Sequence, residues 1–156
     1  MTLAIAGDQG HRGTGSRLPA LSFYPVVMTG APAPLAGVRV VLVDDEPDTL
    51  EFLAYVLAAG GADVAPFADP AAALDSLVAH PPDVVLSDLY MPQMSGWEMI
   101  ERARLRGVRA PAAAMTAHAS IENRSRCVAA GFCACVSKPL APAEVIDLVR
   151  QLASAR

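Results

Sequence analysis

From residue 37 onward, the chain alternates short apolar runs with longer segments in which apolar residues recur every three or four positions. The runs have the length of buried strands and lie at residues 38–43, 63–67, 83–87, 110–115 and 132–137. The longer segments predict helices at residues 47–59, 70–78, 97–106, 120–130 and 142–152. This alternation predicts an α/β fold of the (βα)5 type: a doubly wound, five-stranded parallel sheet covered on both faces.

Residues at the predicted helix ends support this division. Pro47 and Pro70 occupy first helical positions, where a missing backbone N–H costs nothing, and Asp69 is placed to cap the second helix. Gly131 is expected to end the fourth helix, and Gly96 to permit the turn into the third.

Residues 1–36 are rich in Gly, Pro, Ser and Ala and show no sustained period. We expect a flexible N-terminal extension, followed by one domain over residues 37–156. Residues 21–28 could dock as a short strand, which Pro25 weakens, or contact a partner, and Met28 could be the true start.

Composition narrows the classes of function. The net charge of −4 and pI of about 5.2 argue against a general nucleic-acid binder. Three cysteines clustered late in the chain are not a disulfide framework. The N-terminus lacks the pattern of a secretory signal, and no apolar stretch reaches the roughly 18 residues that span a bilayer. We therefore expect a cytoplasmic protein with neither nucleic acid nor membrane as partner.

Polar residues stand at the carboxyl ends of four of the five predicted strands. Asp44 and Asp45 follow the first strand, Asp88 the third, Thr116 the fourth and Lys138 the fifth. Ligands of open parallel sheets bind beyond these ends, so the side chains should converge. Three converging carboxylates need a cation, and oxygen ligands of this kind suit Mg²⁺. A carboxylate with a metal, an ammonium and a hydroxyl around it predicts a phosphoryl-acceptor site.

Lysine usage adds weight to this hypothesis. The chain has eleven arginines but a single lysine, Lys138. Lysine is thus used only where a compact point charge would be wanted, although chance placement at a strand end is the alternative.

The segments VLVDDEPDTL, VVLSDLYMPQMSGWEMI, AAMTAHAS and CVSKPL occur in the order and at the separations of a known family. Over residues 37–153 the sequence resembles the receiver domain of bacterial response regulators, of the chemotaxis-regulator type. The resemblance implies the flavodoxin-like strand order 2-1-3-4-5. It also implies a phosphoryl donor, either a histidine kinase or a histidine phosphotransfer protein.

The resemblance assigns a role to each motif residue. Asp88 would be the phosphoryl acceptor, and Asp44, Asp45 and the main-chain carbonyl of Tyr90 would complete the Mg²⁺ ligands, Asp44 through a water. Thr116 would hydrogen-bond the attached phosphoryl group. Lys138 would pair with Asp88 before transfer and with the phosphoryl oxygens afterwards. The Lys138–Pro139 peptide bond would be cis. The protein would thus be a signalling phosphoacceptor rather than an enzyme acting on other substrates.

Four positions are expected to tune the switch. Ala117 is small, as the family requires beside the phosphoryl group. Tyr90 is predicted to hinder the attacking water and slow self-hydrolysis. His118 either touches the phosphoryl group or water or is an exposed loop residue. Cys135 stands where the family often carries an aromatic switch residue, so signalling is expected to use the Thr116 loop and the helix after it, or an altered partner face. The Cys135 side chain itself either packs simply or leaves a pocket for a partner's aromatic group.

The readout face is expected to comprise the fourth helix, fifth strand and fifth helix, where a downstream protein would bind. Glu122, Arg124 and Arg126 form either a charged partner surface or a solvated face. We expect no DNA-binding output domain, which leaves a stand-alone receiver, a phosphate shuttle or a part of a hybrid histidine kinase. A homodimer is compatible with the sequence.

Three rival classes fit less well. Aspartyl-phosphate phosphatases need a second Asp two residues after the nucleophile, where this chain has Tyr90. P-loop and dinucleotide-binding proteins need a Gly-rich turn after the first strand, where this chain has Asp-Asp-Glu-Pro. A degenerate receiver that binds partners without phosphate is disfavoured by the intact acidic set.

Overall fold

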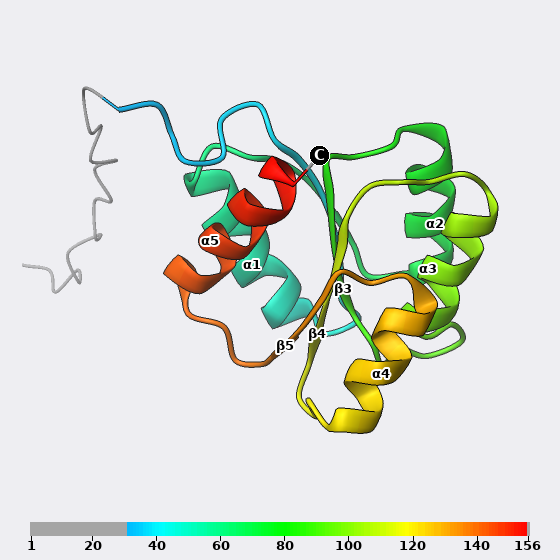
Figure 1. Cartoon of the computed structure of the whole chain (residues 1–156). Coiled ribbons are helices and arrows are strands. Elements are labelled where there is room, and N and C mark those ends of the chain that lie inside the picture. Colours follow the sequence, from blue (N-terminus) through cyan, green and yellow to red (C-terminus); the bar gives the residue numbers. More distant parts are fainter. Residues whose placement is uncertain (1–30, 156) are drawn as a thin grey trace, which may run out of the picture. The chain divides into compact units, whose positions relative to one another are not determined.

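The computed structural model describes residues 31–155, in which five strands and five helices alternate (Figure 1). The strands are β1 (Arg39–Val43), β2 (Asp63–Phe67), β3 (Val84–Asp88), β4 (Ala112–Thr116) and β5 (Ala134–Ser137). The helices are α1 (Pro47–Ala59), α2 (Pro70–Ala79), α3 (Gly96–Leu105), α4 (Ile121–Ala130) and α5 (Pro142–Ser154). All ten predicted elements are present, and their bounds differ from the predicted ones by at most two residues.

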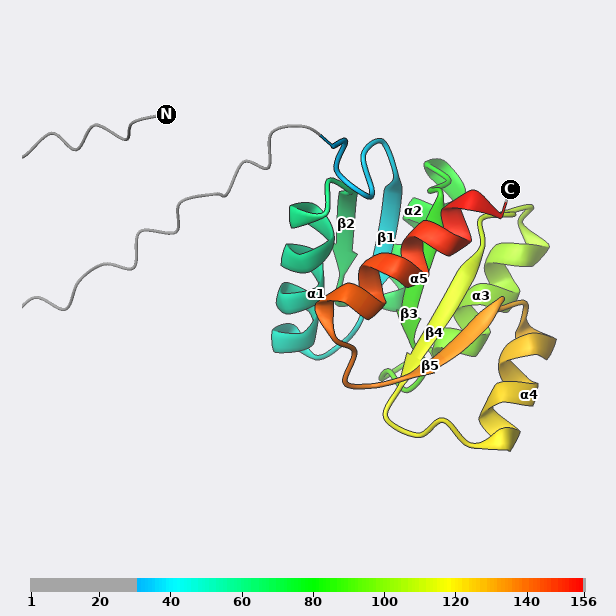
Figure 2. The same cartoon turned by 60° about the vertical axis from the view of Figure 1, so that its left-hand side comes forward.

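The strands form one parallel sheet in the order β2-β1-β3-β4-β5. Helices α1 and α5 cover one face of this sheet, and α2, α3 and α4 cover the other (Figures 1 and 2). The predicted doubly wound α/β fold and its strand order are therefore confirmed. No helix within residues 31–155 is both long and apolar enough to cross a membrane.

Alternate residues of the strands feed two separate cores. In β1, Val40 and Leu42 pack under α1 and α5, whereas Val41 and Val43 pack under α2 and α3. The central strands are apolar at both sets of positions because both faces of the sheet are covered.

The helix termini have the caps that the sequence predicts. The Asp69 carboxylate accepts hydrogen bonds from the backbone N–H groups of Ala71 and Ala72, which would otherwise have no partner within the helix. Gly131 ends α4 with a φ of 99°, a conformation that suits glycine.

Glycine is needed at position 96 for a reason that the sequence did not suggest. A Cβ atom at this position would lie 2.1 Å from the carbonyl oxygen of Asp88. The backbone N–H of Gly96 also donates to the carbonyl of Leu89 at 2.9 Å. Only glycine lets the start of α3 approach β3 so closely, and this approach fixes the loop that follows Asp88.

The packed chain begins before β1. Leu35 is completely buried among residues of α1 and α5, and its backbone N–H donates to the carbonyl of Gly60 at 2.9 Å. The expected domain boundary after residue 36 therefore lies within a segment that already contributes to the core. The expected flexibility of residues 1–30 and the docking of residues 21–28 lie outside the described residues.

Candidate functional site

The carboxyl edge of the sheet gathers the polar residues that the sequence placed at the strand ends. Asp88 and Thr116 are the last residues of β3 and β4, Asp44 follows β1, and Lys138 follows β5. Asp44 and Thr116 are fully buried, and Asp88 is 8% exposed. Charged groups buried to this extent need partners or a ligand, so this edge is the prime candidate for a functional site.

Three carboxylates meet at this edge. Asp44, Asp45 and Asp88 each offer an oxygen atom, and these atoms all lie within 4.8 Å of one another. Among the described residues, no other group of His, Cys, Asp or Glu side chains is arranged to hold a metal ion. Such an oxygen-only donor set fits a hard divalent cation such as Mg²⁺.

Lys138 bridges two of these carboxylates. Its Nζ donates a 2.6 Å hydrogen bond to Asp44 Oδ2 and lies 3.6 Å from Asp88 Oδ2. Burial lowers the pKa of Lys138, but the hydrogen bond and charge of Asp44 outweigh this effect and leave the pKa raised. The expected pairing with Asp88 is present, yet the shorter contact is with Asp44.

Asp44 is itself held in place. Its Oδ1 accepts a 3.0 Å hydrogen bond from the backbone N–H of Glu46, so both carboxylate oxygens have a donor. A fully buried carboxylate with two donors has a defined orientation. Asp44 therefore acts as an anchor that positions the Lys138 ammonium in front of Asp88.

Asp88 is less well compensated than Asp44. Burial raises the pKa of its carboxyl group, Lys138 opposes this shift, and the charge of Asp44 adds to it. The backbone N–H of Leu89 donates to Oδ1 at 2.7 Å and, with the N–H of Tyr90, lowers the pKa again. The net shift of the pKa is upward. The charged form of Asp88 is therefore less stable than that of a solvated carboxylate, and a bound cation would stabilise it.

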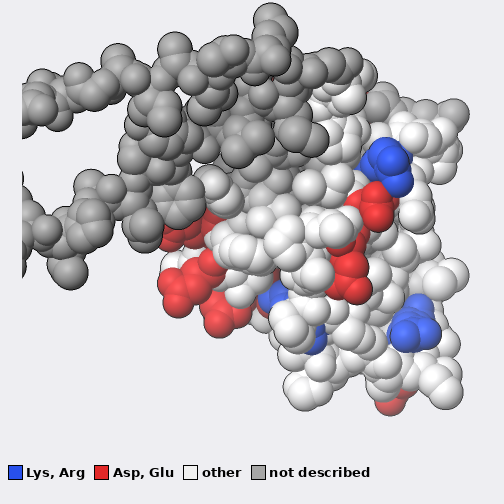
Figure 3. Space-filling model, turned by 90° about the vertical axis from the view of Figure 1, so that its left-hand side faces the viewer, with Lys and Arg blue, Asp and Glu red and all other residues white. Residues whose placement is uncertain are grey.

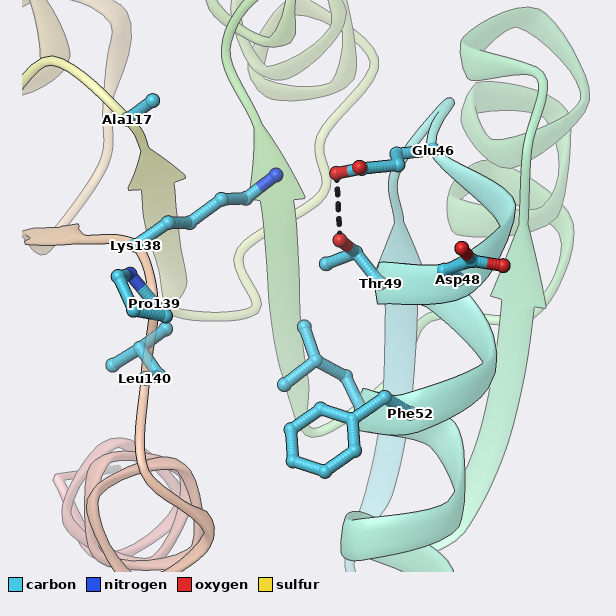
Figure 4. Close-up of a pocket in the computed structure, with 9 residues that line it drawn as sticks. Glu46, Asp48, Thr49, Phe52, Ala117, Lys138, Pro139 and Leu140 are labelled. Carbon is cyan, nitrogen blue, oxygen red and sulfur yellow. Dashed lines mark hydrogen bonds between the residues drawn. The ribbon is translucent and has the colours of Figure 1, made fainter.

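A pocket of about 530 Å³ opens beside Lys138 (Figure 4). Ala117 and Pro139 line one side, and the first turns of α1 line the other, with Thr49 donating to Glu46 at 2.7 Å. Lys138 points across this pocket from the end of β5 toward the start of α1. The Lys138–Pro139 peptide bond is cis, as predicted.

Acidic side chains also lie on one outer side of the domain. On the side of the domain that carries α1 and α5, Asp and Glu side chains gather at the surface (Figure 3). Glu46 at the N-cap of α1 and Asp48 and Glu51 in its first turns are exposed. An anionic phosphoryl donor would be repelled here unless a cation were bound.

Thr116 and His118 shape the loop that leads to α4. The Thr116 hydroxyl oxygen accepts a 3.1 Å hydrogen bond from the backbone N–H of His118. The His118 side chain is exposed, with its ring centroid 6.5 Å from that of Tyr90. The sequence left His118 between two roles, and the structure places it on the loop next to Tyr90.

Tyr90 makes contacts that the sequence did not reveal. Its ring packs edge-on against Trp97 at 5.1 Å, and its hydroxyl exchanges hydrogen bonds with the amide of Asn123 on α4, at 3.0 and 3.2 Å. Asn123 belongs to no sequence motif that predicts a functional role. Its position three residues after the capping Ser120 indicates the start of a helix but not a contact with Tyr90.

Cys135 is half-buried and packs against the core that α2, α3 and α4 share with the sheet. Phe132 is buried in the same core and lies before β5, away from the position of the missing aromatic residue. Cys135 thus packs against the core and also lines a surface pocket beside β5, so both expected roles remain predictions.

Comparison with known proteins agrees with this geometry. The model of the response regulator receiver domain family matches residues 40–150. The chain belongs to this family. The match includes all ten elements apart from the first residue of β1 and the last turn of α5, so the resemblance inferred from the four motifs is confirmed.

Related receiver sequences occur in proteins of different size. The chain is 39% identical over 119 residues to an uncharacterized 14.6 kDa protein of Leptolyngbya boryana, covering 75% of this chain and 91% of that one. It is 34% identical over 112 residues to the sensor histidine kinase RcsC of Escherichia coli, covering 72% of this chain but only 11% of the kinase.

Solved structures of the family superpose well. The signal receiver domain of NarL from Mycobacterium tuberculosis has a TM-score of 0.70 at 28% identity, covering 78% of this chain and 99% of that one. The chemotaxis protein CheY4 of Vibrio cholerae gives 0.70 at 26% identity, covering 74% and 98%. This chain is therefore a two-component receiver domain by both sequence and fold.

Proposed function

We propose that this receiver domain takes a phosphoryl group onto Asp88 from a phosphohistidine of a histidine kinase or phosphotransfer protein. The observation that carries the proposal is the environment of the Asp88 carboxylate. It is largely buried, faces the Lys138 ammonium at 3.6 Å, and shares its edge of the sheet with two further carboxylates.

The chemistry follows from these positions. An Asp88 carboxylate oxygen attacks the phosphorus, the P–N bond to the donor histidine breaks, and the imidazole nitrogen leaves with the bonding electrons. Lys138 neutralises negative charge on the phosphoryl oxygens, and the Thr116 hydroxyl donates a hydrogen bond to one of them. Ala117 leaves the room that these oxygens need.

Asp44, Asp45 and Asp88 would hold Mg²⁺, with the main-chain carbonyl of Tyr90 as a further ligand. The bound cation would supply charge neutralisation between the acidic edge and the incoming phosphoryl group. The residues themselves orient the acceptor oxygen, because Asp44 fixes Lys138 and Leu89 fixes one oxygen of Asp88.

The attached phosphoryl group would act as a signal. It adds about 1.5 to 2 negative charges and new hydrogen-bond acceptors next to Thr116 and Lys138, which shifts the population of the loop before α4. We place the readout on α4, β5 and α5, where Glu122, Arg124 and Arg126 are exposed. A downstream protein would recognise this face.

Incubation with acetyl phosphate or phosphoramidate tests the proposal. With Mg²⁺ present, the intact mass should rise by one phosphoryl group, and chelation with EDTA should prevent the rise. Asp88→Asn should abolish it, whereas Asp75→Asn, which changes an exposed carboxylate of α2 outside the site, is a matched control that should retain it. A wild-type chain that gains no mass, or an Asp88→Asn chain that still does, would contradict the proposal.

A further inference from the structure

The loop after Asp88 is joined to α4 by a neutral contact. The Tyr90 hydroxyl donates to Asn123 Oδ1 at 3.2 Å, and Asn123 Nδ2 donates back to the hydroxyl at 3.0 Å. The same Nδ2 group donates to the carbonyl of His118 at 2.6 Å. Asn123 therefore connects two loops and the first turn of α4, although 33 residues separate it from Tyr90.

These contacts form a chain of hydrogen bonds between Asp88 and Thr116, the two residues that the phosphoryl group would touch. Tyr90 lies two residues after Asp88, and its backbone N–H helps to set the pKa of that carboxyl group. At the other end, the backbone N–H of His118 donates to the Thr116 hydroxyl oxygen at 3.1 Å. The path from Asp88 to Thr116 thus runs through Tyr90, Asn123 and His118.

The surroundings of Tyr90 keep its ring in place. Trp97 is 3% exposed and meets the ring edge-on at 5.1 Å, while the Arg126 guanidinium stacks 4.1 Å over the indole. Arg126 belongs to α4, so this helix is attached to the Tyr90 side of the site at two points. A shift of α4 must disturb the Tyr90–Asn123 pair, the Trp97–Arg126 pair, or both.

We infer that Asn123 is a positioning residue that holds Tyr90 and the β4–α4 loop in the resting arrangement, and so couples the state of Asp88 to α4. This inference rests on the proposed function of Asp88. A Thr116 side chain that turned toward a phosphoryl group would give up its hydrogen bond from the His118 backbone N–H, and Asn123 holds the same loop through the His118 carbonyl. Tyr90 takes the part of the aromatic residue that Cys135 replaces on β5.

Thermodynamic linkage makes the inference quantitative. Suppose that the Tyr90–Asn123 pair is formed in the resting arrangement and lost in the phosphorylated one. A variant without the pair then shifts the equilibrium toward the second arrangement, and it must favour phosphoryl binding by the same factor. Neutral hydrogen bonds of this kind correspond to about 2- to 10-fold in an equilibrium constant. Breaking the pair should therefore raise the affinity for a phosphoryl analogue, whereas simple damage to the site would lower it.

The experiment is a beryllofluoride titration with Mg²⁺, followed by the backbone NMR signals of the first turn of α4. Tyr90→Phe removes only the hydroxyl, and Asn123→Ala removes the amide. Each should raise the beryllofluoride affinity about 2- to 10-fold, and the double variant should gain no more than the larger single effect. The resting spectra of both variants should shift toward that of the beryllofluoride-bound wild type.

Tyr55→Phe provides the matched control, because Tyr55 is an exposed tyrosine on α1 outside this chain of hydrogen bonds. If Asn123→Ala unfolds α4, the beryllofluoride affinity of Tyr90→Phe alone tests the inference. An affinity of Tyr90→Phe equal to or below that of Tyr55→Phe, with a wild-type resting spectrum, would overturn the inference while leaving the proposed function intact. A wild-type chain that binds no beryllofluoride at Asp88 would overturn the proposed function, and the inference with it.

Discussion

On one side of Asp88 the contacts are charged and largely buried, whereas on the other side they are neutral and lie near the surface. Lys138 and the fully buried Asp44 form the charged side, with a 2.6 Å ion pair between residues 94 positions apart. Tyr90 and Asn123 form the neutral side, and Tyr90 is 52% exposed. The charged side suits chemistry, because it fixes charge where phosphoryl oxygens would lie. The neutral side suits switching, because its contacts are weak enough to break.

Among the contacts of Asp88, Lys138 should give the largest effect when it is replaced by Ala, because its ammonium faces the Asp88 carboxylate at 3.6 Å. We expect the rate of phosphorylation by acetyl phosphate to fall by about 100-fold or more, as for the loss of one preorganised electrostatic contact. Intact mass against time measures this rate. Arg150→Ala removes a cation of α5 that pairs with Asp147 and should leave the rate unchanged. A Lys138→Ala rate near that of Arg150→Ala would show that the charged side does not support transfer.

Arg104→Ala should weaken the attachment of α4 from its other end. The Arg104 guanidinium donates to the carbonyls of Val108 and Ala110 at 2.9 and 2.7 Å, and to that of Gly131 at 2.9 Å. Its loss leaves three half-buried carbonyls without this donor, so urea denaturation should show a loss of about 2 kcal/mol in unfolding free energy. Arg102→Ala, which breaks only an exposed pair with Glu98, should cost less than about 0.5 kcal/mol. Equal losses for the two variants would mean that the Arg104 contacts contribute no more than a surface ion pair.

Tyr90→Ala tests whether the ring shields the phosphoryl group from water. We expect self-hydrolysis to accelerate on the order of tenfold, which corresponds to about 1.4 kcal/mol in the barrier. Loss of phosphoryl mass after removal of acetyl phosphate gives the rate. Tyr90→Phe keeps the ring and should hydrolyse at nearly the wild-type rate, which separates shielding from the contact with Asn123. An unchanged rate in Tyr90→Ala would rule out shielding.

Asp88→Asn, which should abolish phosphorylation, should change the stability of the fold only slightly, and the change should be an increase. Because the pKa of the Asp88 carboxyl group is raised by burial, the native state holds its proton to higher pH than the unfolded state does. Native stability therefore falls as pH rises through the window between the unfolded and folded pKa values, and stays lower above it. The amide lacks this loss, so Asp88→Asn should be about 0.5 to 2 kcal/mol more stable at pH 7 in EDTA and nearly equal to wild type well below pH 4. Urea denaturation at the two pH values measures the difference, and a variant that is less stable at pH 7 would contradict it.

The charged side could be predicted from the sequence because strand ends determine it. Once the apolar runs are recognised as parallel strands, the residues that follow them must share one edge, and Asp44, Asp88, Thr116 and Lys138 do. Partner choice at that edge was less predictable. Lys138 lies nearer to Asp44 than to Asp88, which the order of residues along the chain does not encode.

The contacts of Tyr90 and Asn123 on the neutral side could not be predicted from the sequence, because the conformations of two loops determine them. Asn123 meets Tyr90 only through the path of two loops and the angle of α4, and neither follows from periodicity. The close approach of Gly96 to Asp88 and the burial of Leu35 were missed for the same reason. Each depends on how segments distant in sequence pack, which local residue patterns do not encode.

The site of phosphorylation tests the central claim most directly. After incubation with acetyl phosphate and Mg²⁺, borohydride reduces an aspartyl phosphate to homoserine, which peptide mass spectrometry locates to a single residue. The account predicts homoserine at position 88 and nowhere else. Homoserine at position 44 or 45, or an unreduced chain that has nonetheless gained a phosphoryl group, would contradict it.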